Sequence, residues 1–368
     1  MRATRKPDPV ESRIVAGGVS HLRRWYARHA RDLPWRRTRD PYAIWVSEIM
    51  LQQTRVATVI PYWERWMKTW PTVRRLAEAS LDDVLKLWEG LGYYRRARRL
   101  HQAARIIADE YGGHCPRQHA DWLALPGIGP YIAGAIASIA FNLPAPVLDG
   151  NVARVLCRWF DIGQNPMRGP ARKRLWSLAS LLVQEAASQG RRHRRSCGDF
   201  NQALMELGAV ICTPKNPQCA RCPIDRACRA HGRGRGHLLP RMPPRQRLQT
   251  RRVACFILQY RGRFLVERAP ARSWNAGLWG FPQIDMPGPT ASPAALARRA
   301  LGFHPGCGFE LSRTIRHSIT RFDLRLAVYA GRSTRRPPPP RPNQRWATRA
   351  QIDRLALSAA HRKIARAL

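Results

Sequence analysis

The sequence predicts two domains, a mostly helical N-terminal domain and a smaller α+β C-terminal domain. From about residue 20 to residue 229, apolar residues recur at intervals of three and four, the period of an amphipathic helix. After residue 250 the pattern changes to short β-branched or alternating segments separated by turn residues. A Gly-, Pro- and Arg-rich stretch without periodicity lies between the two patterns and is typical of a linker.

The expected boundaries follow from these patterns. Residues 1–19 are expected to be disordered, 20–229 to form the helical domain, 230–250 to be a basic linker and 251–368 to form the α+β domain. Pro/Gly turns such as "LPW", "LPGIGP" and "NLPAPV" separate the helices. The predicted strands are "RRVACFILQY", "RFLVERA" and "RFDLRLAVYAG".

The composition points to a polyanionic partner. The chain has 368 residues, and 64 Lys and Arg against 24 Asp and Glu give a formal charge of +40. Part of this excess is an arginine-rich background, and the remainder favours nucleic acid, because neutralising phosphates releases counterions. The sequence contains no run of eighteen apolar residues, so no membrane span is expected. The N-terminus also lacks the apolar stretch of a secretory signal.

Four of the nine cysteines lie in one loop, "CTPKNPQCARCPIDRAC", at residues 212–228. Zinc sites usually use two well-separated pairs, whereas this compact set of thiols suits a [4Fe–4S] cluster; zinc stays the alternative. We expect the cluster to hold a loop that has no core of its own, with nearby arginines facing a DNA backbone. Clustered thiols favour a reducing compartment, so we expect a cytoplasmic, nucleoid-associated protein. The expected ligands are Cys212, Cys219, Cys222 and Cys228.

The segment "LPGIGPYIAGAI", residues 125–136, is an apolar turn that runs into a helix. Gly127 and Gly129 allow backbone N–H groups at the helix N-terminus to face outward, where they can bind a phosphate. With "DWLA" before it, the segment predicts a helix-hairpin-helix, an element that binds duplex DNA without sequence preference. The alternative for the two glycines alone is an ordinary turn.

Five motifs in order carry a family resemblance: "WVSEIMLQQTRV", "WEGLGYYRRARRLH", "LPGIGPYIAGAI", "VLDGNVARVL" and "FNQALMELGAVICTPKNPQCARCP". Together they resemble the adenine DNA glycosylase (MutY) family of the endonuclease III superfamily, from about residue 20 to 229. The resemblance implies a helix-hairpin-helix glycosylase domain with a [4Fe–4S] loop and a Nudix-like C-terminal domain. It further implies a monomer that acts on double-stranded DNA with adenine opposite 8-oxoguanine or guanine.

Excision of adenine breaks a C1′–N bond, and it requires a proton for the purine and a negative group near the cationic sugar. The helical neighbours of Glu48 at three and four residues are Ile44, Trp45, Leu51 and Gln52. Because this face is largely apolar, burial is expected to raise the pKa of Glu48. The alternative is a solvated helix glutamate. In the resembled family, the matching glutamate protonates the purine.

Asp149 in "VLDGNV" has two compatible interpretations. An Asp before Gly-Asn at a helix start is a common N-cap, and the matching family residue is the carboxylate that faces the developing cation. Tyr131 stands where bifunctional relatives carry a lysine, and a phenol cannot form a Schiff base, so we predict a monofunctional enzyme. By the resemblance, Tyr131 and Asn151 help to order Asp149 and the attacking water.

The target base must be flipped out of the duplex. In this chain, Gln53, Thr54 and Leu91 match family residues that fill the gap left by the base and touch the opposite base. Gln202 matches a residue that binds the adenine edge. Arg31 and Trp35 match residues that line the adenine pocket. Alternatives from the residues alone are a core position for Leu91 or Trp35 and a surface amide for Gln53.

The C-terminal segment "GLWGFPQ" and the strands around it resemble the family's Nudix-like domain, which recognises 8-oxoguanine. The helix "AALARRALGF" lacks the glutamates that hold Mg²⁺ in Nudix hydrolases, so pyrophosphate hydrolysis is not expected. Where many members have Phe-Ser-His, this chain has Ile319, Thr320 and Arg321. Thr320 keeps a hydroxyl for the lesion, and we expect weaker discrimination between 8-oxoguanine and guanine.

Two other functions remain as alternatives. A bifunctional, endonuclease III-like glycosylase/lyase would need an amine where Tyr131 stands. A non-enzymatic iron–sulfur DNA-binding regulator would have no use for the pair Glu48 and Asp149.

Overall fold

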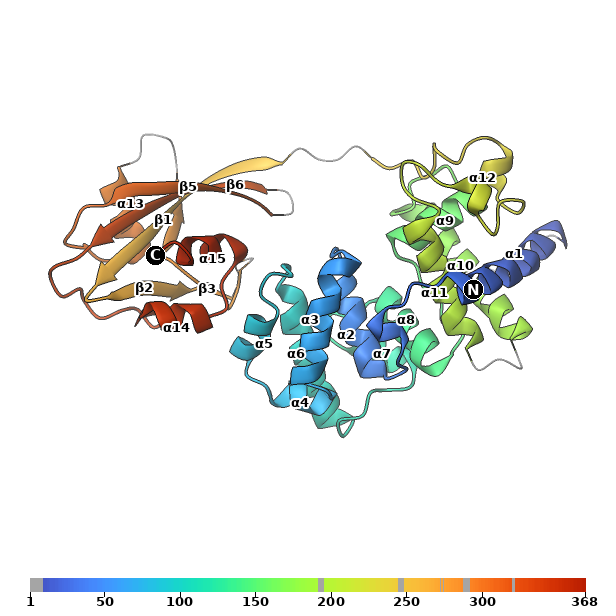
Figure 1. The fold of residues 1–368 in the computed structure, drawn as a ribbon, viewed down its shortest axis with the longest axis horizontal. Coiled ribbons are helices and arrows are strands. Elements are labelled where there is room, and N and C mark those ends of the chain that lie inside the picture. The colour runs from blue at the N-terminus through green and yellow to red at the C-terminus, as the bar shows by residue number, and fades with distance from the viewer. Residues whose placement is uncertain are drawn as a thin grey trace. The chain divides into compact units, whose positions relative to one another are not determined.

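The computed structural model describes residues 9–190, 195–243, 248–271, 273, 275–286, 292–319 and 322–368 (Figure 1). The chain divides into two compact units, Met1–Ala77 with Gln102–Pro244, and Glu78–His101 with Arg245–Leu368. The predicted order of a helical part and then an α+β part is confirmed. Residues 78–101, which the sequence assigned to the helical domain, group instead with the C-terminal unit.

All regular secondary-structure elements in the described residues of the first unit are helices. Its helices are α1 (Pro9–His29), η1 (Pro34–Arg36), α2 (Pro41–Leu51), α3 (Val56–Thr69), α4 (Val73–Glu78), α7 (His119–Ala124), α8 (Pro130–Phe141), α9 (Gly150–Trp159), α10 (Gly169–Gln189), α11 (Ser196–Val210), η2 (Cys219–Arg221) and α12 (Arg229–Gly232). One apolar cluster joins α1, α9, α10 and α11 through residues such as Leu22, Trp159, Leu182 and Phe200. No helix in the described part of the chain is both long and apolar enough to cross a membrane.

The two ends of this unit differ from the sequence expectation. Residues 9–19, expected to be disordered, belong to α1, because Val15 and Val19 continue its apolar stripe into the core; residues 1–8 lie outside the described residues. In the expected linker, Ala230 and Leu239 are buried, and Arg158 Nε donates to the Leu239 carbonyl over 2.8 Å. The linker therefore begins as a packed part of the first unit.

The second unit is a sheet with helices. Its elements are α5 (Leu81–Leu87), the start of α6 (Arg95–Glu110), β1 (Gln249–Tyr260), β2 (Arg263–Arg268), β3 (Trp279–Gly280), β4 (Gln283–Asp285), α13 (Pro293–Leu301), β5 (Glu310–Ile319), β6 (Phe322–Arg332), β7 (Gln344–Ala347), α14 (Arg349–Arg354) and α15 (Ala359–Ala365). The strand order is β3-β2-β1-β6-β5, with β4 paired to β1 and β7 to β2. The predicted strands correspond to β1, β2 and β6, whereas the edge strand β5 was not predicted.

Alternating side chains of β1 pack against the helices on opposite faces of this sheet. Ala254, Phe256 and Leu258 pack with α13, and Cys255 and Ile257 pack in the cluster that includes α14 and α15. Successive side chains of a strand point to opposite faces, so one apolar strand can support a helical layer on each side. Helices therefore cover both faces (Figure 1).

Candidate active site

Helix α2 places Glu48 in the interior of the first unit. The helix begins with Asp40 as N-cap, whose Oδ1 accepts the Tyr42 N–H over 3.0 Å. Glu48 is 5% exposed. Burial raises its pKa to about 7, a hydrogen bond from Tyr131 opposes this shift, and the charge of Asp149 adds to it. At neutral pH this carboxyl therefore holds its proton for a substantial part of the time.

The hairpin places Tyr131 against this carboxyl. Gly127 has a φ of +84° in the turn after α7, and Gly129 is the N-cap of α8. One residue into that helix, the Tyr131 hydroxyl donates to Glu48 Oε2 over 2.6 Å and lies 3.2 Å from Met205 Sδ. Burial raises the pKa of Tyr131, and the charges of Glu48 and Asp149 raise it further. The phenol thus stays protonated and serves as a donor.

Asp149 caps α9 and faces the same site. Its Oδ1 accepts the Val152 N–H over 2.7 Å, so the predicted N-cap is present. Burial raises the pKa of Asp149, whereas hydrogen bonds from the backbone of Val152 and Asn151 lower it. Burial is the largest cause at both carboxyls, and the pKa of each is raised overall; backbone amide donors oppose this rise at Asp149, and the Tyr131 hydroxyl opposes it at Glu48. Two carboxyls in unlike surroundings form the arrangement that divides acid and base roles.

The side chain of Asn151, expected to help order Asp149 and the attacking water, is hydrogen-bonded to Arg154. Its Oδ1 accepts from Arg154 Nη2 over 2.9 Å. Arg154 also donates to the Gly208 carbonyl over 2.7 Å and to the Cys212 carbonyl over 2.8 Å. One guanidinium therefore joins the first turn of α9, the end of α11 and the first cysteine of the loop.

A buried carboxylate that the sequence analysis missed binds Arg31. The Arg31 Nε and the Arg36 Nη2 each lie 2.7 Å from a carboxylate oxygen of Glu206. Burial raises the pKa of Glu206, but the hydrogen bonds from Arg31 and Arg36 outweigh burial, and the pKa falls to about 2. Gln202 is half-buried four residues earlier on α11, so both side chains lie on one helical face. The position of Glu206 inside the apolar run "ALMELGAV" is the sequence feature that indicates a buried carboxylate.

The surroundings of Trp35 agree with the alternative interpretation, a core position. The indole is buried and packs edge-on to Trp63, with ring centroids 6.1 Å apart. This packing agrees with a core position, and the expectation that Trp35 lines the adenine pocket stays a prediction.

The expected DNA-contacting residues differ in exposure. Gln53 is exposed with a φ of +57°, a conformation uncommon for a residue with a side chain. Thr54 beside it is half-buried. Leu91 is 6% exposed, which agrees with a core position, whereas Tyr93 is 43% exposed. In this loop Tyr93, which the sequence analysis did not select, is the side chain available to a partner. Thr320 and Arg321 lie outside the described residues.

The four expected ligand cysteines line one pocket. Apolar residues such as Val155 and Ile211 complete it, together with Arg158. Arg158 is buried, and its Nη1 donates to Cys212 Sγ over 3.2 Å. Within the described ranges, no three His, Cys, Asp or Glu side chains are arranged to hold a metal ion directly. The shared pocket is what brings the four thiols together.

Comparison with known proteins identifies both parts of the chain. Residues 46–180 match the HhH-GPD superfamily of base excision DNA repair proteins, and residues 253–367 match the NUDIX domain. A solved thermostable thymine-DNA glycosylase is 30% identical with a TM-score of 0.53, over 60% of this chain and 98% of that one.

Similar proteins named adenine DNA glycosylase occur in several organisms. The one from Homo sapiens is 38% identical over 93% of this chain and 72% of its own length. That from Rattus norvegicus is 52% identical, but over 61% of this chain and 44% of its own. One from Buchnera aphidicola is 35% identical over 71% of this chain and 73% of its own. With the buried Glu48 beside Asp149, these similarities show that the chain is a DNA glycosylase and belongs to the adenine DNA glycosylase family.

Proposed function

We propose that this protein hydrolyses the N-glycosidic bond of adenine mispaired with 8-oxoguanine or guanine and leaves the DNA strand intact. The observation that carries the proposal is a buried Glu48 with a pKa of about 7 that shares its site with Asp149. A carboxylic acid that is protonated near neutral pH can donate to a departing base. A second carboxyl close to it can stabilise positive charge on the sugar.

The residues allow a balanced hydrolysis. Glu48 donates its proton to a ring nitrogen of the flipped adenine while the C1′–N bond breaks and its electrons leave with the base. The Asp149 carboxylate stabilises the oxocarbenium-like sugar. Water then adds to C1′, and its proton passes to the ionised Glu48, which restores the acid. The products are adenine and an abasic site.

Tyr131 supports hydrolysis without strand cleavage. Lyase chemistry in bifunctional enzymes needs an amine that forms a Schiff base with the sugar. Helix α8 contains no lysine, and the Tyr131 hydroxyl is engaged with Glu48 over 2.6 Å. We therefore favour a role in holding the acid over covalent attack.

The pocket of four thiols fits a [4Fe–4S] cluster held by Cys212, Cys219, Cys222 and Cys228. A single zinc ion draws four ligands to within about 2.3 Å of one point, whereas a polynuclear cluster accepts thiolates spread around it. The buried Arg158, which donates to Cys212 Sγ over 3.2 Å, complements the negative charge of such a group. When bound, the cluster would supply structural cross-linking of residues 212–228.

We assign lesion recognition to the C-terminal unit. Helix α13 has the sequence PAALARRAL and no acidic side chain, so it offers no carboxylate for the Mg²⁺ of a Nudix hydrolase. Ile319 ends β5 where many members of the family have phenylalanine. We expect weaker discrimination between 8-oxoguanine and guanine, and single-turnover rates on both mispairs would test it.

The deciding experiment uses duplexes that contain adenine opposite 8-oxoguanine, assayed with and without alkali. Strand breaks that appear only after alkali are expected, because an abasic site is alkali-labile. Breaks without alkali would favour the bifunctional alternative. The absence of breaks under both conditions, with the duplex still bound, would favour a DNA-binding regulator. Sedimentation of the protein on the same duplex tests the expected monomer.

A further inference from the structure

The loop between α5 and α6 presents chemistry suited to DNA. Tyr93 is 43% exposed, and the exposed Arg95 and Arg99 follow it. An exposed aromatic ring beside guanidinium groups can stack on bases and bind phosphates. Gly90, Gly92 and Tyr93 have φ values of +105°, +70° and +47°. For Tyr93 this conformation is unfavourable, so the surrounding structure must hold it.

Glu89, near the start of this loop, is bound by an arginine of the C-terminal helix α15. Arg362 Nε lies 2.5 Å from Glu89 Oε1, and Arg362 Nη2 lies 2.9 Å from Oε2. Both side chains are 14% exposed. A two-pronged contact between a guanidinium and a carboxylate fixes orientation as well as distance, and its partial burial reduces screening by water.

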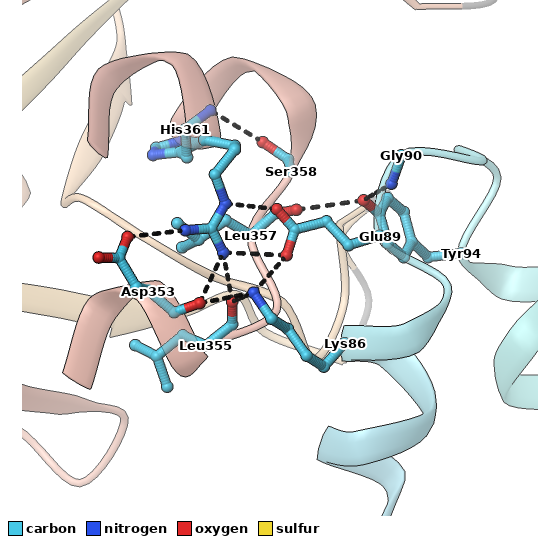
Figure 2. Close-up of polar contacts among 10 residues, drawn as sticks. Lys86, Glu89, Gly90, Tyr94, Asp353, Leu355, Leu357, Ser358 and His361 are labelled. Atoms are coloured by element: carbon cyan, nitrogen blue, oxygen red, sulfur yellow. Dashed lines mark hydrogen bonds and ion pairs between the residues drawn. The ribbon is translucent and has the colours of Figure 1, made fainter. Parts of the chain in front are cut away.

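The same cations hold the end of α14. Lys86 Nζ donates to the carbonyls of Asp353 over 2.6 Å and Leu355 over 3.2 Å, and Arg362 Nη2 donates to the Leu355 carbonyl over 2.7 Å. The last carbonyls of a helix have no partner within it, and cations near that end stabilise them. Lys86 Nζ also lies 3.1 Å from Glu89. One carboxylate and two cations therefore join α5 to α14 and α15 (Figure 2).

A tyrosine attaches the other side of the loop. The Tyr94 hydroxyl donates to the Leu357 carbonyl over 3.1 Å and accepts the Gly90 N–H over 3.4 Å (Figure 2). The residues on both sides of Gly90–Tyr93 are thus bonded to one short segment of the C-terminal unit, residues 353–362.

We propose that Arg362 is a positioning residue for base excision: through Glu89 it fixes the loop that carries Tyr93, and the C-terminal unit thereby controls how this loop meets DNA. The unit then has two tasks, recognition of the base opposite adenine and support of a loop outside its own sheet. The kinetic part of this proposal rests on the proposed adenine excision. The support of the loop itself does not depend on any substrate.

Hydrogen exchange of the full-length protein without DNA tests the support of the loop. In Arg362→Gln, amides of residues 88–94 should exchange at least tenfold faster, while amides of β1 and β6 keep their protection. Glu89→Gln should give the same local change and leaves the contact of Arg362 with Leu355 in place, so it serves if Arg362→Gln folds poorly. Arg366→Gln is the matched control, because it removes one positive charge from an exposed side chain just beyond α15.

Single-turnover excision of adenine opposite 8-oxoguanine tests the positioning. Arg362→Gln and Glu89→Gln should each slow excision about tenfold, and the double variant should be no slower than either, because both variants break the same contact between Arg362 and Glu89. Arg362→Lys keeps the positive charge but loses the two-pronged guanidinium contact, so its excision rate should lie between those of Arg362→Gln and the native protein.

Three results would overturn the proposal: unchanged exchange at residues 88–94, additive rate losses in the double variant, or faster local exchange with an unchanged rate. A native protein that excises no adenine would refute the proposed function instead, and the exchange measurement would still decide whether Arg362 supports the loop.

Discussion

The Tyr131 hydroxyl donates a hydrogen bond of 2.6 Å to Oε2 of Glu48. The bond occupies one oxygen of the carboxyl, so in the proposed mechanism the other oxygen carries the proton for transfer. It also favours the charged form of Glu48, against the effect of burial. The acid is therefore held in one orientation, with a pKa close to neutrality.

Replacement of the acid should separate chemistry from binding. Glu48→Gln keeps the shape and can still accept the Tyr131 hydrogen bond, but it has no transferable acidic proton. Single-turnover adenine release should fall by at least about a thousandfold, and affinity for the uncleaved duplex in a filter-binding assay should change less than threefold. Unchanged turnover would refute the assignment of Glu48.

Removal of the phenol should move the pH profile. The proposed mechanism needs Glu48 protonated, so the native rate should decline as the pH rises through about 7. Tyr131→Phe deletes a donor that stabilises the carboxylate, so the pKa of Glu48 should rise and the decline should shift to higher pH. Rates from pH 5 to 9 measure this shift. A shift to lower pH would contradict the role given to the phenol.

The loop before α6 allows a paired comparison. Leu91 is buried, so Leu91→Ala should cost about 2–5 kcal/mol of stability, as large-to-small core substitutions do. Tyr93→Ala removes an exposed ring, so it should leave the melting temperature nearly unchanged and weaken duplex binding severalfold. Thermal melting and binding titrations of both variants check this. The opposite pattern would favour Leu91 as the residue that touches DNA.

Glu206 should stabilise the first unit in a pH-dependent way. Because its folded pKa is lowered to about 2, its contribution is fully present above the unfolded value of about 4.5 and is lost as the pH falls toward 2. Glu206→Gln should therefore lower the melting temperature at pH 7, by an amount equivalent to about 2 kcal/mol. The difference from the native protein should shrink between pH 4.5 and pH 3. A constant difference would show that packing, and not charge, is responsible.

Arg154 should couple the cysteine loop to the start of α9. Arg154→Met keeps much of the volume but leaves the carbonyls of Gly208 and Cys212 without this donor. We expect a stability loss of about 2–3 kcal/mol, a lower iron content on purification and slower adenine release. Arg172→Gln on α10, an exposed site, serves as control. Normal iron content together with native kinetics would contradict the coupling.

The sequence could predict what depends on one helix or one turn. The burial of Glu48 follows from apolar neighbours three and four residues away, and the Asp149 cap follows from the residues after it. The pairing of Arg31 with Glu206 could not be predicted, because helical periodicity gives the face of a helix and not the distant residue that meets it. The start of α1 was missed because a charged, Pro-containing N-terminus obscured Val15.

Similarly, the grouping of residues 78–101 with the C-terminal unit depends on contacts such as Glu89 with Arg362, which are 273 residues apart in the chain. A local sequence pattern cannot predict a contact between residues so far apart in the chain. Family resemblance supplied the roles of several site residues, but it did not indicate that Leu91 is buried and Tyr93 exposed.

The contact between Arg31 and Glu206 joins residues that are 175 positions apart, and α1 packs in the same cluster as α10 and α11. At roughly 5–20 residues per second of synthesis, α11 leaves the ribosome on the order of 9–35 s after Arg31. Throughout that interval the apolar stripe of the emerging N-terminal helix lacks its final neighbours. A chaperone that shields exposed apolar segments should therefore associate with nascent chains from which α11 has not yet emerged and dissociate once it has emerged.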